Sequence, residues 1–272
     1  MPGNDRQHRR KGEARHERKV EAMVKEMKNY LSFGGGVNSV AMYLLLMDQG
    51  MEPGDPDKGF EAVFVDHGTD WPETYEYVEM FKSKYPLTVL RPDVGTIEGK
   101  RFNNLYDFSY FKKLFPVRVA RWCTTDFKRR PLKKYHQTPC FVMIGYSSEE
   151  SHRAKISSEN GQEFRWPLIE NEIDRAGCKE IIKQHGLPVP PKSGCYICPF
   201  QRMGQLREFR KKHPELFCKI EQLENRNNEH RASLGKLPYY SFGKPVREVA
   251  EKNINQSKLW AEDEFPPCEC ML

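Results

Sequence analysis

Short apolar runs separated by segments of helical spacing recur along the first two thirds of the chain. Runs of large apolar side chains, typical of buried strands, occupy residues 30–33, 60–65, 87–90 and 140–145. Residues 39–49 and 73–85 place apolar side chains at the spacing of a helix face. Strands that alternate with helices favour a parallel sheet with helices on both faces. The pattern therefore predicts an α/β fold.

The pattern changes on either side of this region. Residues 1–28 are rich in charged side chains and predict an N-terminal tail. After residue 165, prolines, loops and cysteines dominate up to Gln201, and a charged helical stretch covers residues 203–231. We therefore predict three parts: the tail 1–28, an α/β domain 29–165, and a cysteine-containing C-terminal segment 166–272.

The first predicted strand leads directly into a glycine loop. Ser32, Phe33 and three consecutive glycines, Gly34, Gly35 and Gly36, precede Val37, Asn38 and Ser39, and a helix follows. Backbone N–H groups of such a loop and of the helix start are suited to phosphate oxygens. The loop lacks the lysine of a Walker motif and the spacing of the dinucleotide fingerprint. It predicts a phosphate site of another kind.

Overall composition limits the class of protein. Hydrophobic residues make up 38% of the chain and the mean hydropathy is −0.77. Apolar runs are far shorter than a membrane span, and the charged N-terminus has no apolar leader. Eight cysteines without a leader favour a reducing compartment. We expect a cytoplasmic protein with no membrane partner.

Positive charge is concentrated in one part of the sequence. Residues 111–135 hold nine lysines and arginines against one aspartate, although the whole chain has a net charge of only +6. A solvated helix usually mixes both signs, whereas a block of one sign indicates a polyanionic partner. We expect that partner to be a nucleotide, a nucleic acid, or both.

Four cysteines form a candidate metal site. Cys195 and Cys198 have the C-x-x-C spacing that presents two sulfurs to one centre, and Cys123 and Cys178 are further candidates. Iron–sulfur clusters are normally held by four cysteines, and structural zinc takes four Cys or His ligands. We interpret the set as ligands of a [4Fe-4S] cluster, with Zn²⁺ or redox or structural thiols as alternatives.

Several motifs resemble those of the PP-loop superfamily of ATP pyrophosphatases and PAPS reductases. The glycine loop resembles Ser-Gly-Gly-x-Asp-Ser with one residue inserted and Asn38 in place of aspartate. Asp66-His67-Gly68 and Pro72-Glu73-Thr74 resemble the Asp-Thr-Gly and Pro-Glu-Thr elements, with His67 in place of threonine. Two later segments resemble Cys-x4-Lys-x2-Pro and Gly…Glu-Ser…Arg, and they contain Cys123, Lys128, Pro131, Gly145, Glu150, Ser151 and Arg153.

This resemblance implies a HUP-type, Rossmann-like sheet and assigns roles to particular residues. The expected phosphate-binding residues are Ser32, Gly34, Gly35, Gly36, Asn38 and Ser39. Asp66 and Glu150 would contact Mg²⁺ or the ribose. Ser39 would also act in catalysis, and Lys128, Arg129 and Arg153 would stabilise charge in the transition state.

The function implied is an iron–sulfur ATP pyrophosphatase that forms AMP and pyrophosphate and supports sulfur transfer to nucleic acid, as in DNA phosphorothioation. Its expected partners are ATP or a related adenine nucleotide, a cysteine desulfurase or other sulfur donor, and nucleic acid. Two alternatives stay open, a PAPS or APS reductase and a non-catalytic nucleotide-binding or nucleic-acid-binding module. The C-terminal pair Cys268 and Cys270 has no assigned role.

Overall fold

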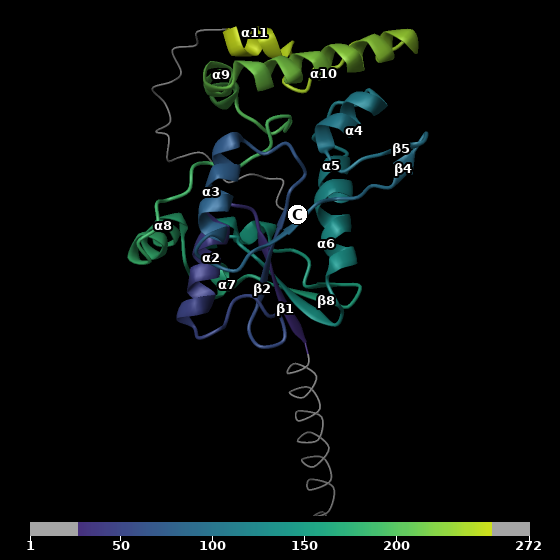
Figure 1. Ribbon diagram of the computed structural model, residues 1–272. Helices are drawn as coiled ribbons and strands as arrows, with labels where there is room; N and C mark the ends of the chain where they lie inside the picture. Colours follow the sequence, from purple (N-terminus) through teal and green to yellow (C-terminus); the bar gives the residue numbers. More distant parts are fainter. Residues whose placement is uncertain (1–26, 252–272) are drawn as a thin grey trace, which may run out of the picture.

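The computed structural model describes residues 27–251, and a six-stranded sheet forms its centre (Figure 1). The strands are β1 Lys28–Phe33, β2 Glu61–Val65, β3 Thr88–Leu90, β6 Cys140–Ile144, β7 Ser158–Glu159 and β8 Gln162–Arg165. Their spatial order is β3-β2-β1-β6-β8-β7, in which β7 alone pairs antiparallel to its neighbour. This confirms the predicted α/β class.

Strand β1 occupies the middle of the sheet. Leu31 pairs with Ala62 of β2 on one side and with Met143 of β6 on the other. The chain proceeds from β1 to β2 and β3 in one direction, and β6 and β8 lie in the opposite direction. Ligands of open parallel sheets bind at the carboxyl ends of strands where the order reverses. That point lies at the end of β1, where the glycine loop begins.

Alternate residues of the central strands enter two separate cores. Leu31, Phe33 and Phe64 pack with α2 (Val37–Asp48), α3 (Pro72–Lys82) and α8 (Arg175–Gln184). Tyr30 and Val63 face the opposite side, where Leu132 of α6 (Arg130–Tyr135) covers them. Because successive strand residues point to opposite faces, a sheet buried on both sides needs apolar residues at nearly every position.

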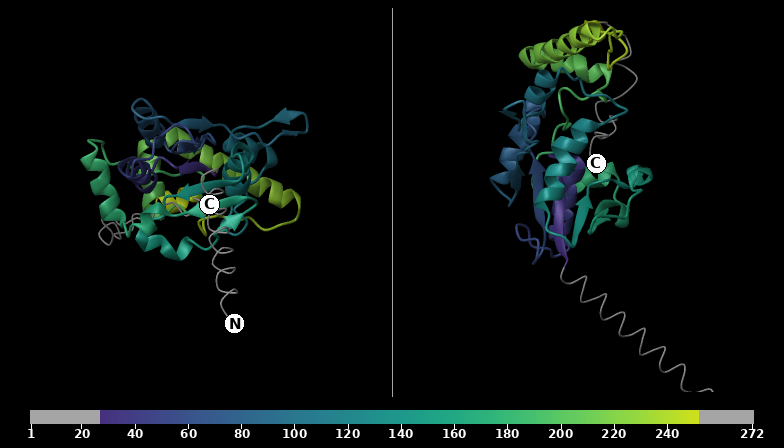
Figure 2. Two further views of the ribbon diagram at one scale, coloured as in Figure 1. Left: turned by 90° about the horizontal axis from the view of Figure 1, so that it is seen from below. Right: turned by 90° about the vertical axis from the view of Figure 1, so that its right-hand side faces the viewer.

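A third core lies beyond the carboxyl ends of the strands. It joins α4 (Leu105–Lys112), α9 (Met203–Lys212), α10 (Pro214–Ser233) and α11 (Val246–Glu251) to residues 195–198. Figures 1 and 2 show α9, α10 and α11 as a layer of helices at that end of the sheet. The predicted helical stretch 203–231 is thus two helices, because Pro214 starts a new helix.

The remaining elements are short. They are β4 Thr96–Ile97, β5 Lys100–Arg101, α5 Trp122–Thr124, the π-helical turn Thr125–Arg129, the 3₁₀ turn Ser148–Arg153 and α7 Pro167–Glu170. Within residues 27–251, no helix combines the length and apolar character needed to cross a membrane.

Candidate functional site

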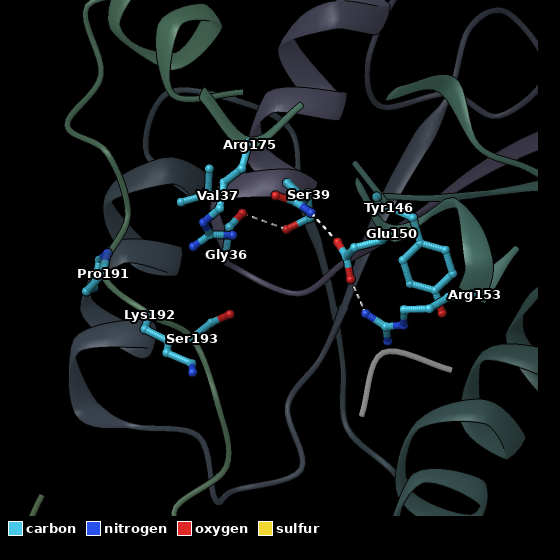
Figure 3. Close-up of a pocket in the computed structure, with 12 residues that line it drawn as sticks. Gly36, Val37, Ser39, Tyr146, Glu150, Arg153, Arg175, Pro191, Lys192 and Ser193 are labelled. Atoms are coloured by element: carbon cyan, nitrogen blue, oxygen red, sulfur yellow. Dashed lines mark hydrogen bonds and ion pairs between the residues drawn. The ribbon is translucent and has the colours of Figure 1, made fainter. Parts of the chain in front are cut away.

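A pocket opens where β1 and β6 end, and we call it the glycine-loop pocket (Figure 3). Its empty volume, which includes space open to solvent, is about 440 Å³. It is lined by Gly36, Val37, Asn38, Ser39, Gly145, Tyr146, Glu150, Arg153, Arg175, Pro191, Lys192 and Ser193. The residues thus come from the loop, from the segment after β6 and from the C-terminal segment.

At two positions of the loop, the surrounding structure leaves room only for glycine. Gly35 has a φ of +67°, and a Cβ there would lie 3.0 Å from Val78 and 3.1 Å from Thr74 of α3. A Cβ on Gly36 would lie 2.5 Å from Oγ of Ser193. The loop is therefore held between α3 and the C-terminal segment, and larger residues would push these apart.

The first turn of α2 faces this pocket without a side-chain cap. Gly36 is the N-cap, no side chain accepts from the first N–H groups, and the first turn holds no acidic residue. The hydroxyl of Ser39 donates to the Gly36 carbonyl over 3.0 Å. A helix start in this state attracts anions, because its N–H groups carry partial positive charge.

Glu150 is the carboxylate among the residues that line the pocket. One of its oxygens accepts from Nδ2 of Asn38 over 2.7 Å, and the other pairs with the Arg153 guanidinium. The guanidinium of Arg153 also lies 4.3 Å from the centroid of the Tyr146 ring. An aspartate at position 38 would oppose Glu150 in a buried setting, which explains the asparagine physically.

Lys192 and Arg175 bring positive charge to the pocket from outside the glycine loop. Burial and the neighbouring charges of Arg202 and Arg175 lower the pKa of Lys192 to about 8. Like charges held close together in a partly buried site favour an anionic ligand. The sequence interpretation missed Arg175, Lys192 and Ser193. Their only signal was the position of Lys192 and Ser193 immediately before the C-x-x-C element.

A second cavity, which we call the thiol cavity, contains three of the cysteines. It is lined by His67, Leu105, Pro116, Cys123, Thr124, Lys128, Cys195, Ile197 and Cys198. Burial raises the pKa of Cys123, raises that of Cys198 to about 11, and raises that of Cys195 well above its usual value. In the unliganded chain these sulfurs are therefore thiols at neutral pH.

Backbone contacts fix the C-x-x-C turn to the loop that follows β2. The N–H of Tyr196 donates to the Thr69 carbonyl over 2.8 Å, and the N–H of Trp71 donates to Gly194 over 2.9 Å. Asp70 and Cys195 form a β-bridge. These bonds place Cys195 beside the polar side chains of residues 67–70.

Cys178 does not belong to the thiol cavity, and this corrects the predicted four-cysteine set. It is fully buried in the core between α2 and α8, where burial raises its pKa to about 12. Among residues 27–251, no group of three or more His, Cys, Asp or Glu side chains is arranged to hold a metal ion. The three remaining thiols surround one cavity, but the structure does not offer the compact four-ligand set that zinc requires.

Ser32, a predicted phosphate-binding residue, and Arg129, predicted to stabilise charge in the transition state, lie on the other side of the sheet. Ser32 and Arg129 line a separate cavity next to α6, and Arg129 pairs with Glu159 over 2.7 Å. Ser32 points there because it shares a strand face with Tyr30. Gly34 and Gly35 shape the loop, but the pocket lining begins at Gly36. These positions correct the assignment of Ser32 and Arg129.

Two further candidates also lie outside the glycine-loop pocket. Asp66 accepts hydrogen bonds of 3.0 Å from the Gly68 N–H and the Tyr75 hydroxyl, and its other oxygen lies 3.5 Å from Nε of Arg91. Lys128 lines the thiol cavity instead. Of the predicted catalytic residues, Ser39, Glu150 and Arg153 line the glycine-loop pocket.

The Pro-Glu-Thr element has a structural role. Pro72 lies in the first turn of α3, and Thr74 is buried against the glycine loop. Glu73 pairs with Nε2 of His213 over 2.9 Å, which ties α3 to the helical layer. Thr74 therefore supports the glycine loop, and Glu73 connects α3 to α9 and α10 through His213. Cys268 and Cys270 lie outside the described residues.

Comparisons with known proteins identify relatives of this chain. The chain is 27% identical to protein MJ0973 of Methanocaldococcus jannaschii over 71% of its own length, which is 47% of MJ0973. It is 24% identical to MJ0066 of the same organism, over 71% of this chain and 40% of MJ0066. The chain therefore spans less than half the length of these relatives.

Two solved structures are also similar. Phosphoadenylyl-sulfate reductase from Candida auris, a phosphate complex, is 17% identical with a TM-score of 0.44, over 63% of this chain and 79% of that chain. The U34-tRNA thiolase NcsA from Methanococcus maripaludis, solved with its [4Fe-4S] cluster, is 14% identical with a TM-score of 0.35, over 82% of this chain and 80% of that chain.

The family assignment comes from the domain model, which matches residues 28–181. The matched region includes the whole central sheet, the glycine loop and the residues that follow β6. It ends before Lys192, Ser193 and the C-x-x-C turn. The chain belongs to the phosphoadenosine phosphosulfate reductase domain family.

Proposed function

We propose that this chain is an adenylating ATP pyrophosphatase, which cleaves ATP to AMP and pyrophosphate and supports sulfur transfer to nucleic acid. The observation that carries the proposal is the uncapped start of α2 in a pocket that also holds Arg153, Arg175 and Lys192. Backbone N–H groups and three cations facing one space suit a polyphosphate better than a neutral ligand.

In this proposal the pocket acts mainly through electrostatics. Attack on the α-phosphate places negative charge on the departing pyrophosphate, and Lys192 and Arg175 are placed to stabilise it. Mg²⁺ prefers carboxylate oxygens, and Glu150 is the carboxylate in the pocket lining. Arg153 and Asn38 would orient that carboxylate, since both already contact it.

The thiol cavity supplies the sulfur side of the proposed reaction. If a [4Fe-4S] cluster is bound, Cys123, Cys195 and Cys198 are the residues that would hold it, because their side chains surround one cavity. Such a cluster would supply electron-transfer or sulfide-binding chemistry. The sulfur would come from a cysteine desulfurase or another donor protein.

The proposed acceptor is nucleic acid, with DNA phosphorothioation as the favoured reaction. The basic block 111–135 borders the thiol cavity: Lys128 lines it, and Arg118 and Arg121 both lie 5.7 Å from the ring centroid of Phe200, two residues after Cys198. A phosphodiester backbone suits such a surface because its charge is regularly spaced.

A reductase of PAPS or APS is the second candidate. It is favoured by the family assignment and by thiols that lie close to an anion-binding pocket. It would release sulfite from the sulfonucleotide in a thiol-dependent reaction and would not cleave ATP. A third candidate, a binding module without turnover, would bind ATP and leave it unchanged.

The test is to incubate anaerobically purified protein with Mg²⁺ and ATP and identify the products. AMP and pyrophosphate should form, and Lys192→Ala and Ser39→Ala should reduce their rate. Lys133→Ala is the matched control, because Lys133 lines the cavity on the opposite side of the sheet. Sulfite release from PAPS without AMP formation from ATP would instead support the reductase.

A further inference from the structure

A third hollow opens between the loop after β2 and the helices α3, α4 and α10, and we call it the tyrosine hollow. Tyr75, Tyr106 and Tyr196 are among its lining residues, and its empty volume, which includes space open to solvent, is about 930 Å³. None of its lining residues lines the glycine-loop pocket or the thiol cavity. The proposed function therefore gives it no role.

The tyrosine hollow lies behind the C-x-x-C turn. Cys195 and Ile197 line the thiol cavity, whereas Tyr196, which stands between them in sequence, lines the tyrosine hollow. Asp70 also lines the hollow and forms a β-bridge with Cys195. The turn and the loop after β2 thus form a wall that separates the two spaces.

The lining of this hollow is acidic, although the chain as a whole is basic. Asp70, Glu76 and Asp107 contribute three carboxylates, and Lys219 contributes one ammonium, which gives the described lining a formal charge of −2 against +6 for the chain. Within residues 27–251, neither Glu76 nor Asp107 forms an ion pair. Such a lining attracts cations and repels phosphate groups.

The aromatic rings of the hollow are also suited to cations. Nζ of Lys219 lies over the ring of Tyr106, 5.4 Å from its centroid, so an ammonium of the chain itself already contacts this ring. The ring centroids of Tyr106 and Tyr196 are 6.4 Å apart. Ammonium and guanidinium groups are attracted to such rings because the ring faces carry partial negative charge.

Tyr196 adds a polar group that lacks a partner. Tyr196 is 4% exposed, and its hydroxyl forms no hydrogen bond with any other residue between positions 27 and 251. By contrast, the Tyr75 hydroxyl donates to Asp66 over 3.0 Å, and the Tyr106 hydroxyl donates to Gln222 over 3.4 Å. A buried hydroxyl without a partner requires an explanation, and a ligand with N–H donors would satisfy its oxygen.

We propose that the tyrosine hollow binds an organic cation, a guanidinium or alkylammonium group, against Tyr106 and Tyr196 and beside the carboxylates of Glu76 and Asp107. Among residues 27–251, no acidic group is arranged to hold a metal ion, which favours an organic cation over a metal. A small free amine or guanidine and the basic side chain of another protein share this chemistry. The proposal stands independently of the proposed function.

The experiment is calorimetric titration of the full chain with two probes of similar shape. Agmatine has a guanidinium at one end and an ammonium at the other, and in N-carbamoylputrescine an uncharged urea replaces the guanidinium. Agmatine should bind about five- to tenfold more tightly. Glu76→Gln and Asp107→Asn should each weaken agmatine binding about two- to fivefold. Glu79→Gln is the matched control and should change nothing, because Glu79 is an exposed acid of α3 outside the lining.

Two further variants distinguish a cation site from a structural cluster. Lys219→Gln should strengthen agmatine binding, since it removes a competing charge from the Tyr106 ring. Tyr196→Phe keeps the ring and should weaken agmatine binding, while the melting temperature stays the same or rises because no hydrogen bond is lost. Weaker binding in Lys219→Gln, or unchanged binding together with a lower melting temperature in Tyr196→Phe, would contradict the proposal.

A peptide identifies the source of the cation. Tighter binding of acetyl-Gly-Arg-Gly-amide than of agmatine would indicate a basic side chain of another protein, and the reverse order would indicate a free amine or guanidine. Equal affinities for agmatine and N-carbamoylputrescine, or no binding of either agmatine or the peptide, would overturn the proposal. These titrations need no ATP turnover. A chain that binds agmatine but makes no AMP would therefore contradict the proposed function alone.

Discussion

The hydroxyl of Thr69 lies 3.1 Å from the sulfur of Cys195. The same hydroxyl lies 2.7 Å from Nδ1 of His67, and the Thr69 N–H donates to that nitrogen over 3.3 Å. The bond from the Thr69 N–H uses Nδ1 as an acceptor, and the other ring nitrogen, Nε2, lies 3.3 Å from Asp70. Thr69 thus donates to His67 and accepts from the Cys195 thiol.

Replacing Thr69 with valine should destabilise the fold by about 1–2 kcal/mol, because buried polar groups of His67 and Cys195 would each lose a partner. Urea unfolding of the full chain measures this change. Thr69→Ser keeps the hydroxyl and should recover most of the stability. A loss of stability in Thr69→Ser but not in Thr69→Val would mean that the methyl group, rather than the hydrogen bond, matters at this position.

Asp70 should make stability depend on acid pH. Burial alone would raise its pKa, but the attraction and hydrogen bond of His67 and the charge of Lys128 hold its pKa below the usual value. A carboxylate with a lowered folded pKa stabilises the fold above its unfolded pKa of about 3.9, and this contribution is lost as the pH falls further. Asp70→Asn should therefore be less stable at pH 7, and its free energy of unfolding should fall less steeply as the pH is lowered into the acid range. An equally steep fall in the wild-type and Asp70→Asn chains would contradict this.

The pair Asn38 and Glu150 predicts a specific incompatibility. Asn38→Asp would place a second carboxylate at the position of a 2.7 Å hydrogen bond to Glu150. We expect the free energy of unfolding to fall by about 2–4 kcal/mol. Adding Glu150→Gln should restore most of it, because an amide again faces a carboxylate. The two changes measured singly and together give the coupling, and simple additivity would show that the residues do not interact.

The sequence pattern was sufficient for the central sheet but not for its edge. Residues 30–33, 60–65 and 140–145 are mostly apolar on both faces, which favours strands buried on both sides of a sheet. Three of the four residues of strand β8, Gln162–Arg165, are polar, and the strand is exposed on part of its length. Its pairing with β6 depends on a long-range contact that local propensity does not encode.

The site was predictable only where its residues lie in the glycine loop or directly after a strand. Glu150 and Arg153 follow β6, and their placement comes from strand direction. Lys192 reaches the pocket because the C-terminal segment returns across the loop, where Ser193 meets Gly36. Cys178 and Cys195 both directly follow a glycine but enter different cores. Spacing along the chain could not distinguish them.

Lys192 should make anion binding fall at alkaline pH. Its pKa of about 8 in the free chain means that it loses its charge as the pH rises above that value. Affinity for inorganic pyrophosphate, measured by calorimetry across about pH 7–10, should then fall by up to about tenfold per pH unit. Lys192→Arg keeps its charge over this range and should remove the decline. A decline of equal slope in Lys192→Arg would assign the effect to another group.

The last prediction distinguishes the cysteines of the thiol cavity, which would bind iron, from Cys178, which lies in the core. In chain purified anaerobically and reconstituted with iron and sulfide, Cys198→Ala should lose bound iron because Cys198 lines the cavity. Cys178→Ala should keep the wild-type iron content and lose only about 1 kcal/mol of stability, since Cys178 packs as a small apolar residue between α2 and α8. Iron analysis and urea unfolding of the same preparations decide between the two roles. Loss of iron in Cys178→Ala with the fold intact would restore the four-cysteine set. Absence of iron in the wild-type chain would remove the cluster from the proposal and leave a cavity of three protonated thiols.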